Sequence, residues 1–298
     1  MNGLMEKVRL IELRTRGLVE SAFAGEWHSA IRGRGIDFDQ VREYVVGDDV
    51  RSIDWNVTAR AGRPYVKQFR EERELRLMLL VDISASGDFG SATQRKRELA
   101  AELACVLAMS AVRNNDQVGL VMFSDRIEGF VPPGKGRQHV LRVVRELLGA
   151  EPQGRGTNVS AALDFVGPML HRRSLVFVLS DLEVGAARDA ALEALSRSAR
   201  PLGARHDAVA FHVRDPRERS LPNLGLVTVE DAESGDVVLL DTARRGVRER
   251  YARVAAERAA EVQRLLRRAR FEVVELDTAK SYVPVLLSFF AGRDRRVR

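Results

Sequence analysis

The chain has 298 residues, of which 45% are hydrophobic and 30% are charged, and its formal net charge is +6. This length and composition allow one large hydrophobic core and a smaller module, and they exclude a disordered or low-complexity chain. Most of the basic residues are arginines interleaved with acidic residues, a pattern typical of solvated helix faces, so we do not expect nucleic acid as a partner.

The chain contains a single cysteine, Cys105, which excludes an internal disulfide and a cysteine-rich metal site. One cysteine in an apolar segment suits the reducing cytoplasm. The N-terminal segment lacks the apolar middle of a secretory signal, and the longest apolar stretches are shorter than the roughly 20 residues of a membrane-spanning helix. We therefore expect a soluble, cytoplasmic protein without a membrane span.

Residues 1–75 form the first predicted domain. A charged helix is expected to open the chain, and it is followed by the run GRGIDFDQVREYVVGDDVRSIDWNVTARAGRPYVKQFREERE. This run is rich in β-forming residues, is interrupted at VGDD and AGRP, and has no long helical period. The sequence therefore predicts a small β-rich module before the second domain.

Residues 76–298 form the second predicted domain, in which apolar strands alternate with amphipathic helices. The predicted strands are 76–82, 117–124, 174–181, 207–215 and 271–277. The predicted helices are 93–114, 136–150, 158–170, 187–200, 243–269 and 281–292, with a hairpin at 224–242 and a turn at 132–138 (PPGKGRQ). This alternation predicts an α/β fold, Rossmann-like, with a mostly parallel sheet flanked by helices.

Oxygen-bearing side chains follow predicted strands or loops at three places. Asp82, Ser84 and Ser86 alternate directly after the first strand, Thr157 follows a glycine-rich loop, and Asp181 ends a later strand. Ligands of open parallel sheets collect at the carboxyl ends of strands, and an oxygen-only set without His or Cys suits Mg²⁺ or Mn²⁺. Each piece alone could be an ordinary helix cap, but the three together favour a metal site.

This three-part pattern resembles the metal-ion-dependent adhesion site (MIDAS) of von Willebrand factor A domains. The resemblance implies that the hydroxyls of Ser84, Ser86 and Thr157 contact the metal. Asp82 and Asp181 would act directly or through water, and an acidic side chain of a partner would fill the open coordination position.

The upstream run, above all Gly47–Trp55 (GDDVRSIDW), resembles the signature of the bacterial family called domain of unknown function 58. Members of this family are typically encoded beside MoxR-type AAA+ ATPases and are thought to act with them in assembling or activating protein complexes. The resemblance therefore implies a Mg²⁺-dependent adaptor or co-chaperone. Its partners would be such an ATPase and a client protein that presents an acidic side chain to the metal.

The charged residues of the family signature have two interpretations. The residues that we expect to contact a partner are Asp48, Asp49, Arg51, Asp54 and Trp55. The charges could instead form an ion-pair lattice that ties the module to the sheet, with Trp55 and Tyr44 as packing anchors.

A metal-dependent hydrolase acting on phosphoryl-type substrates is the alternative function, because a cation with an open position can activate water. Such an enzyme needs a general base near the metal, and only Asp88 and Asp181 are candidates. We expect Asp88 to begin the following helix rather than to turn toward the site. The five histidines are scattered, and none lies in a recognisable nucleophile motif. We therefore predict a binding protein rather than an enzyme.

Overall fold

The computed structural model describes residues 36–71, 75–183, 187–232 and 235–297. They form two compact units, the smaller ending at Leu75 and the larger beginning at Arg76. The helix expected to open the chain lies outside the described residues. None of the helices in the described ranges is long and apolar enough to cross a membrane.

The smaller unit is an antiparallel strand pair with two short helical segments in the connection. Its elements are β1 (Ile36–Glu43), η2 (Val50–Ser52), α3 (Trp55–Ala61) and β2 (Tyr65–Glu71). The strand pair confirms the β-rich module. The helix α3 was not expected, because seven residues are too few to show a helical period. It ends at Gly62, whose φ of 69° is a left-handed conformation that favours glycine.

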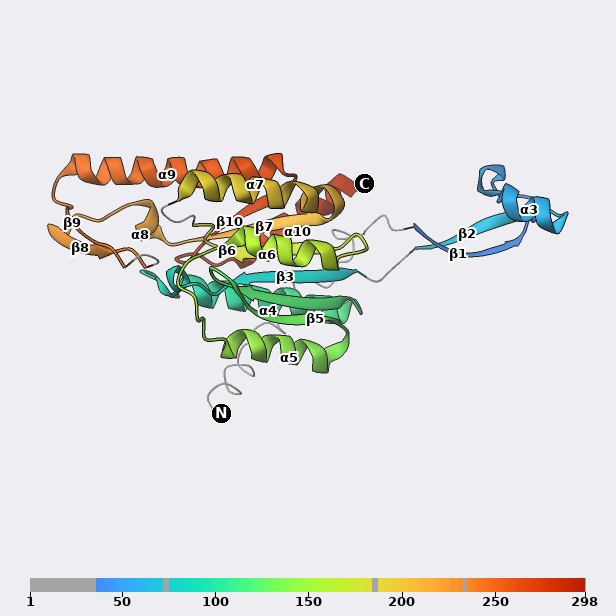
Figure 1. Cartoon of the computed structure of the whole chain (residues 1–298), viewed down its shortest axis with the longest axis horizontal. Coiled ribbons are helices and arrows are strands. Elements are labelled where there is room, and N and C mark those ends of the chain that lie inside the picture. The colour runs from blue at the N-terminus through green and yellow to red at the C-terminus, as the bar shows by residue number, and fades with distance from the viewer. Residues whose placement is uncertain (1–35, 72–74, 184–186, 233–234, 298) are drawn as a thin grey trace. The chain divides into compact units, whose positions relative to one another are not determined.

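A six-stranded sheet forms the centre of the larger unit (Figure 1). Its strands, in spatial order, are β10 (Glu272–Asp277), β7 (Asp207–Arg214), β6 (Leu175–Ser180), β3 (Arg76–Asp82), β4 (Gln117–Phe123) and β5 (Ile127–Gly134). All neighbouring strands are parallel except β4 and β5, which are antiparallel. This arrangement confirms the Rossmann-like α/β fold with a mostly parallel sheet.

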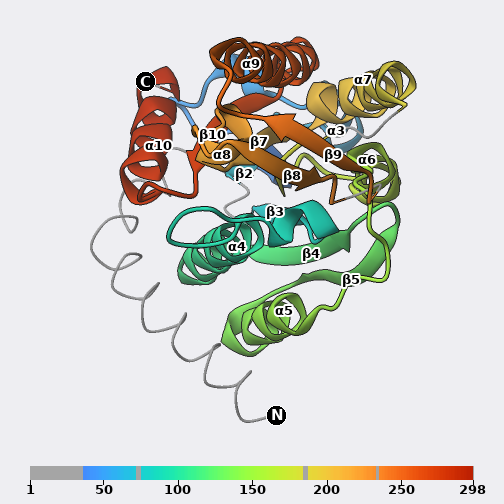
Figure 2. The same cartoon turned by 90° about the vertical axis from the view of Figure 1, so that its left-hand side faces the viewer.

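Helices cover both faces of this sheet (Figure 2). One face carries α4 (Lys96–Arg113), α5 (Gly136–Gly149) and α10 (Val283–Val297), and the other carries α6 (Val159–Val166), α7 (Arg188–Arg205) and α9 (Arg245–Arg268). The shorter elements are η3 (Ala85–Asp88), η4 (Gly167–Met169), α8 (Pro216–Arg219) and the hairpin strands β8 (Leu226–Glu230) and β9 (Val237–Asp241).

Alternate residues of the central strands point to the two helical layers. Met78 and Leu80 of β3 belong to a core cluster that also contains residues of α6, α7 and α9. On the other face, Phe177 and Phe211 lie edge to face with ring centroids 5.3 Å apart, and Phe289 of α10 packs against both rings. Burial on both faces explains why these strands are nearly continuous apolar runs.

The strand β5 is the main element that the sequence pattern did not indicate. It contains Pro132 and Pro133, which lack the N–H that a central strand needs, and residues 132–138 were expected to form a turn. In the structure β5 is the edge strand beside β4. An edge tolerates proline because only one side of the strand is paired.

The order of the strands reverses between β3 and β6. From β3 the chain moves outward through β4 and β5, and it later returns to β6 on the opposite side of β3. The carboxyl ends of two adjacent parallel strands therefore meet at a switch point, where ligands of such sheets bind. Asp82 ends β3 and Asp181 directly follows β6, so the fold brings both carboxylates to this point.

Gly203 of α7 lies at a close approach to the end of α9. A Cβ atom at Gly203 would lie 2.0 Å from the carbonyl oxygen of Ala269 and 3.3 Å from the Phe271 ring. We expect Gly203→Ala to lower the free energy of unfolding by about 1–3 kcal/mol, because backbone and ring must move apart. Chemical denaturation monitored by circular dichroism measures this change.

Gly246, in the first turn of α9, is the matched control for this substitution. A Cβ atom there has no neighbour within 4 Å. Gly246→Ala should leave stability unchanged or raise it by up to about 1 kcal/mol, because alanine favours the helix. Equal effects at Gly203 and Gly246 would contradict the tight contact between α7 and Ala269.

Candidate metal centre

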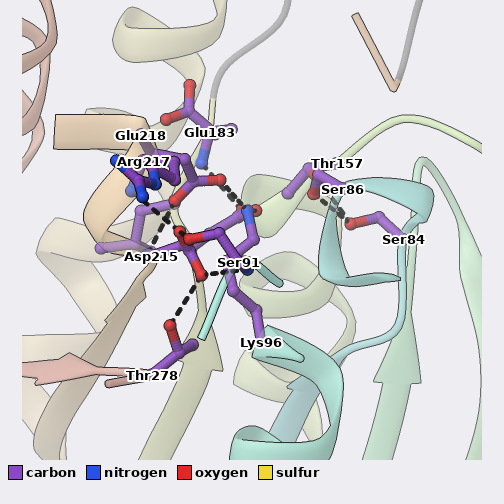
Figure 3. Close-up of polar contacts among 12 residues, drawn as sticks. Ser84, Ser86, Ser91, Lys96, Thr157, Glu183, Asp215, Arg217, Glu218 and Thr278 are labelled. Atoms are coloured by element: carbon purple, nitrogen blue, oxygen red, sulfur yellow. Dashed lines mark hydrogen bonds and ion pairs between the residues drawn. The ribbon is translucent and has the colours of Figure 1, made fainter. Parts of the chain in front are cut away.

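Three hydroxyl groups meet at the switch point of the sheet (Figure 3). The Ser84 Oγ lies 3.0 Å from the Ser86 Oγ, and the Thr157 hydroxyl donates a hydrogen bond to the Ser84 Oγ at 2.9 Å. Ser84 and Ser86 are buried, while Thr157 is half-buried. The structure therefore brings together the three residues whose hydroxyls were expected to contact a metal.

The loop after β3 holds the two serines in place. The Asp82 Oδ1 accepts a hydrogen bond from the Ser84 backbone N–H at 2.9 Å. The Ala85 N–H donates to the Arg155 carbonyl at 3.1 Å, which joins this loop to the one that carries Thr157. The alternation of Asp82, Ser84 and Ser86 thus becomes a tight turn with both hydroxyls directed to one place.

A second carboxylate orders the loop that carries Thr157. The Glu128 Oε1 accepts hydrogen bonds from the Ser124 hydroxyl at 2.5 Å and from the Gly154 N–H at 2.7 Å. Gly154 has no room for a side chain, because a Cβ atom would lie 2.2 Å from the Asp125 Oδ1. The next residue after Thr157, Asn158, caps α6, so Thr157 itself is not the helix cap.

Asp82 lies behind the hydroxyls and is buried. Its Oδ2 accepts a hydrogen bond from the Ser180 hydroxyl at 2.5 Å. Burial, followed by the negative charge of Asp181, raises the pKa of Asp82 to about 7, although hydrogen bonds from Ser180 and Ser84 oppose the shift. The buried carboxyl groups of Asp82 and Asp181 lie close enough to repel each other when both are ionised, so a positive charge nearby stabilises this site.

The raised pKa of Asp82 has a consequence for stability in the metal-free chain. Because the native state binds this proton more tightly than the unfolded chain, Asp82 stabilises the fold at pH below about 4, and this contribution falls as pH rises toward 7. In EDTA, Asp82→Asn should become more stable relative to wild type over that range, with a slope of at most about 1.4 kcal/mol per pH unit. A pH series of urea denaturation curves tests this, and a difference that stays constant with pH would contradict it.

Lys96, the first residue of α4, supplies positive charge inside the fold. Its ammonium donates a hydrogen bond to the Asp181 Oδ2 at 2.6 Å and pairs with Glu218 of α8 (Figure 3). Only 3% of the Lys96 side chain is exposed. Burial opposes its charged form, but Asp181 and Glu218 outweigh burial and raise the pKa of Lys96 above its usual value.

The same contact sets the ionisation of Asp181. Burial favours its neutral form, but the charge and hydrogen bond of Lys96 outweigh burial. With hydrogen bonds from the Ser86 hydroxyl and the Glu183 N–H, they hold the pKa of Asp181 below its usual value. The pKa of Asp181 is thus lowered, which favours its anionic form, whereas the pKa of its neighbour Asp82 is raised.

A further buried carboxylate, Asp215, fastens the segment that follows β7. It accepts hydrogen bonds from the Ser91 N–H, the Thr278 hydroxyl and the Arg217 N–H, each at 2.8 Å (Figure 3). Burial raises the pKa of Asp215, but these hydrogen bonds together lower it below the usual value. Glu218, which pairs with Lys96, is thereby held at the rim of the site by the capping box that Asp215 begins.

The sequence predicted five residues of this site. It did not indicate four others that contact these five or lie next to them in the same network, which are Lys96, Ser180, Asp215 and Glu218. One of these had a readable signal, because Asp215-Pro-Arg-Glu218 has the spacing of a capping box and begins at the last residue of a predicted strand. Lys96 had none, because a lysine in the first turn of an amphipathic helix ordinarily faces solvent.

The donor set fits a hard cation such as Mg²⁺. Three hydroxyl oxygens converge, two carboxylates stand behind them, and no nitrogen or sulfur ligand is among them. Across the described ranges, no group of three or more His, Cys, Asp or Glu side chains could hold a metal ion. A metal here would depend on hydroxyl ligands and would keep strong affinity for an additional anionic ligand.

Asp88 does not begin the helix that follows it. It ends the 3-10 turn η3, whereas α4 begins at Lys96. Its half-exposed carboxylate lies 3.8 Å from Arg95 and 3.9 Å from Arg97. These arginines attract the carboxylate from the side of α4.

The partner-binding candidates of the smaller unit separate into two groups. Asp48 forms a two-pronged ion pair with Arg42, with both N–O distances 2.6 Å, and the Arg42 hydrogen bond lowers the pKa of Asp48 to about 2. Asp49 caps η2, and Asp54 caps α3 while lying 3.6 Å from the Lys67 ammonium. These three carboxylates serve the local fold of the unit.

The other two candidates of that unit face solvent. Arg51 is exposed, and 67% of Trp55 is exposed, so Trp55 is not a packing anchor within its own unit. Val46 is 95% exposed on the same connection between β1 and β2. An exposed tryptophan with exposed valines is an apolar surface of the kind that binds other proteins.

The strand order, with helices on both faces of the sheet, defines a Rossmann-like α/β protein with a mostly parallel six-stranded sheet. Over residues 40–261 the sequence matches the family described as "Protein of unknown function DUF58". The chain belongs to this family.

Relatives and solved structures are similar to this chain at different levels. An uncharacterized protein of Mycobacterium tuberculosis is 32% identical over 296 residues, covering 98% of this chain and 90% of the relative. The crystal structure of BatB from Bacteroides thetaiotaomicron is 16% identical, covers 74% of this chain and 99% of that chain, and has a TM-score of 0.45. The VWA domain of SpRpn10 is 11% identical, covers 74% of this chain and 95% of that domain, and has a TM-score of 0.38.

Proposed function

We propose that the chain is a Mg²⁺-dependent protein-interaction module rather than an enzyme. The observation that carries the proposal is the convergence of the Ser84, Ser86 and Thr157 hydroxyls within hydrogen-bonding distance at the switch point. A dication held by neutral hydroxyls and few anions remains strongly attractive to a further carboxylate. A Glu or Asp of a partner protein is the ligand that this chemistry selects.

The alternative of a phosphoryl hydrolase receives no support from the candidate bases. Lys96 holds the Asp181 carboxylate, and Arg95 and Arg97 attract Asp88. A general base must be free to take a proton from the water that it activates, and both carboxylates are instead engaged by these cations. The geometry therefore favours binding over hydrolysis.

The proposed partner is a MoxR-type AAA+ ATPase, with which the chain would act as an adaptor or co-chaperone in assembling or activating protein complexes. Support for this partner comes from membership of the family, whose members are typically encoded beside such ATPases. Exposed Arg51 and Trp55 are the residues of the smaller unit that we assign to partner contact. A cytoplasmic location suits a chain whose single cysteine is a buried thiol.

Capture of partners on the immobilised full-length chain tests the proposal. Wild type and Asp82→Ala are incubated with native bacterial extract in Mg²⁺ or in EDTA, and retained proteins are identified by mass spectrometry. We expect an AAA+ ATPase on wild type in Mg²⁺ only, because Asp82 holds the loop that carries the two serines. Asp88→Ala is the control, since it removes an exposed carboxylate of the same loop.

Other retention patterns would contradict the metal's role. An ATPase retained in all conditions would move the interface elsewhere, and its loss in Trp55→Ala would place it on the smaller unit. Absence of an ATPase from wild type in Mg²⁺ would reject this partner.

A further inference from the structure

The hairpin of β8 and β9 exposes a concentrated group of aliphatic side chains. They are Leu224 (68% exposed), Leu226 (69%), Val229 (36%), Val237 (62%), Val238 (53%) and Leu239 (65%). Scattered exposed aliphatic residues are normal, but a contiguous group on one short element marks an interaction surface.

The strand register shows which face of the hairpin is open. Pairing of Thr228 with Leu239 and of Glu230 with Val237 places Leu226, Leu239 and Val237 on one face, since opposite residues of an antiparallel pair share a face. The opposite face includes two half-buried residues, Val227 and Leu240. The first face is therefore the more open one. It carries the exposed aliphatic residues Leu226, Val237 and Leu239 beside Thr228, Glu230 and Asp241.

The tip of the hairpin is acidic, although the whole chain has a net charge of +6. Glu230, Asp231 and Asp236 are exposed at the end of the two strands. The local charge is thus opposite to that of the whole chain. A partner that meets this tip is favoured if it carries basic side chains there.

The backbone of the hairpin offers a second kind of contact. Within the described residues, β8 and β9 pair only with each other, so each strand has one edge that no further strand covers. Such edges bind extended peptides by adding a strand, and alternate side chains of the peptide then meet the exposed face.

The position of the hairpin relates it to the candidate metal centre. Figures 1 and 2 both show β8 and β9 at the end of the sheet where β3 and β6 finish. The hairpin follows α8 in the chain, and Glu218 of α8 is tied to Asp181 through Lys96. A protein bound at the metal would therefore meet the same end of the sheet as this hairpin.

We infer that the hairpin is a docking surface for an extended segment of a protein partner. The segment carries aliphatic side chains at alternate positions, pairs along the edge of β8 or β9, and places Lys or Arg beside Glu230 and Asp236. The inference rests on the proposed function, because the segment belongs to the partner that presents its carboxylate to the metal.

Selection from a displayed library of random peptides tests the inference. Peptides are selected on the full-length wild-type chain in Mg²⁺ and in EDTA, and the affinities of the selected peptides are measured by fluorescence anisotropy. The test variant is Leu226→Glu/Leu239→Glu, which adds charge to the aliphatic face. The matched control is Ala256→Glu/Ala260→Glu, which adds the same two charges at exposed positions of α9. Thermal unfolding of both variants verifies that they are folded.

We expect the selected peptides to combine alternating aliphatic residues with Lys or Arg. They should bind wild type and the control equally, and they should bind the test variant at least tenfold more weakly. Equal affinity for the test variant would overturn the inference, as would peptides with a helical apolar spacing or an empty selection. Self-association of wild type that is lost in the test variant would also overturn it, because a second copy would then be the occupant.

The two arms with and without metal separate this inference from the proposed function. Peptides that bind equally in Mg²⁺ and EDTA but lose affinity for the test variant support the hairpin even if the metal has no role. Conversely, Mg²⁺-dependent capture of the ATPase that is unaffected by Leu226→Glu/Leu239→Glu would support the metal site and reject the hairpin.

Discussion

Replacing Lys96 by Met is expected to lower the free energy of unfolding by about 3–5 kcal/mol at pH 7, the usual cost of removing one partner from a buried ion pair. The ammonium is almost completely buried and contacts both Asp181 and Glu218. Methionine fills similar space but leaves Asp181 and Glu218 without their counter-charge, and Asp82 lies beside Asp181. The loss should therefore be electrostatic in origin.

Two further measurements distinguish charge from packing in this prediction. In Lys96→Met the pKa of Asp181 should rise above that of the unfolded chain, and the pKa of Glu218, which burial already raises, should rise further. The native state then binds protons more tightly, so the variant recovers stability as pH falls. The triple variant Lys96→Met/Asp181→Asn/Glu218→Gln should also regain stability, because no charge is left unpaired. Added Mg²⁺ should partly restore Lys96→Met by supplying positive charge nearby.

Lys280 provides the control for this experiment. It is exposed, so Lys280→Met should change the free energy of unfolding by no more than about 0.5 kcal/mol. Urea denaturation at several pH values measures all four proteins. If Lys96→Met also changes the free energy of unfolding at pH 7 by no more than about 0.5 kcal/mol, the buried ion pair contributes little to stability.

Removing the Ser84 hydroxyl is expected to weaken metal binding at least tenfold, which corresponds to about 1.4 kcal/mol. Its oxygen contacts the hydroxyls of both Ser86 and Thr157, so it lies at the centre of the donor set. Ser84→Ala removes one proposed ligand and leaves the two carboxylates in place. Thr157→Ala should act in the same direction, because it removes another ligand from the opposite loop.

Titration of Mn²⁺ followed by electron paramagnetic resonance, with Mg²⁺ as a competitor, measures these affinities directly and needs no partner protein. The control is Ser110→Ala, which removes a buried hydroxyl of α4 that donates to the Val106 carbonyl. Unchanged affinity in both Ser84→Ala and Thr157→Ala would show that the hydroxyl cluster does not hold the ion.

Much of the larger unit follows from local patterns in the sequence. The five predicted parallel strands correspond to β3, β4, β6, β7 and β10, because strands buried on both faces must be apolar throughout. The long helices and the hairpin of residues 224–242 were likewise evident from their periods. The strand β5 was not, since two prolines are tolerated only at a sheet edge, and the edge position is a property of the assembled sheet.

The candidate site shows the same division between local and tertiary information. The sequence alone placed Asp82, Ser84 and Ser86 after a strand, because their spacing is local and typical of a known motif. Their contact with Thr157, which is 73 residues from Ser84, requires the order of the strands. The fold provides that contact by joining the loop after β3 to the loop between α5 and α6 at the switch point.

The positive charge of Lys96 at the site could be recognised only from the tertiary structure. Lys96 resembles an ordinary surface lysine until α4 packs against the sheet and buries its ammonium beside Asp181. Trp55 shows the reverse case, because the sequence left open whether it packs or contacts a partner, and the structure exposes it within its unit. Periodicity and spacing determine which residues can form strands, helices and turns. The partners of a charged or aromatic side chain depend on elements distant in the sequence, and their burial follows from that packing.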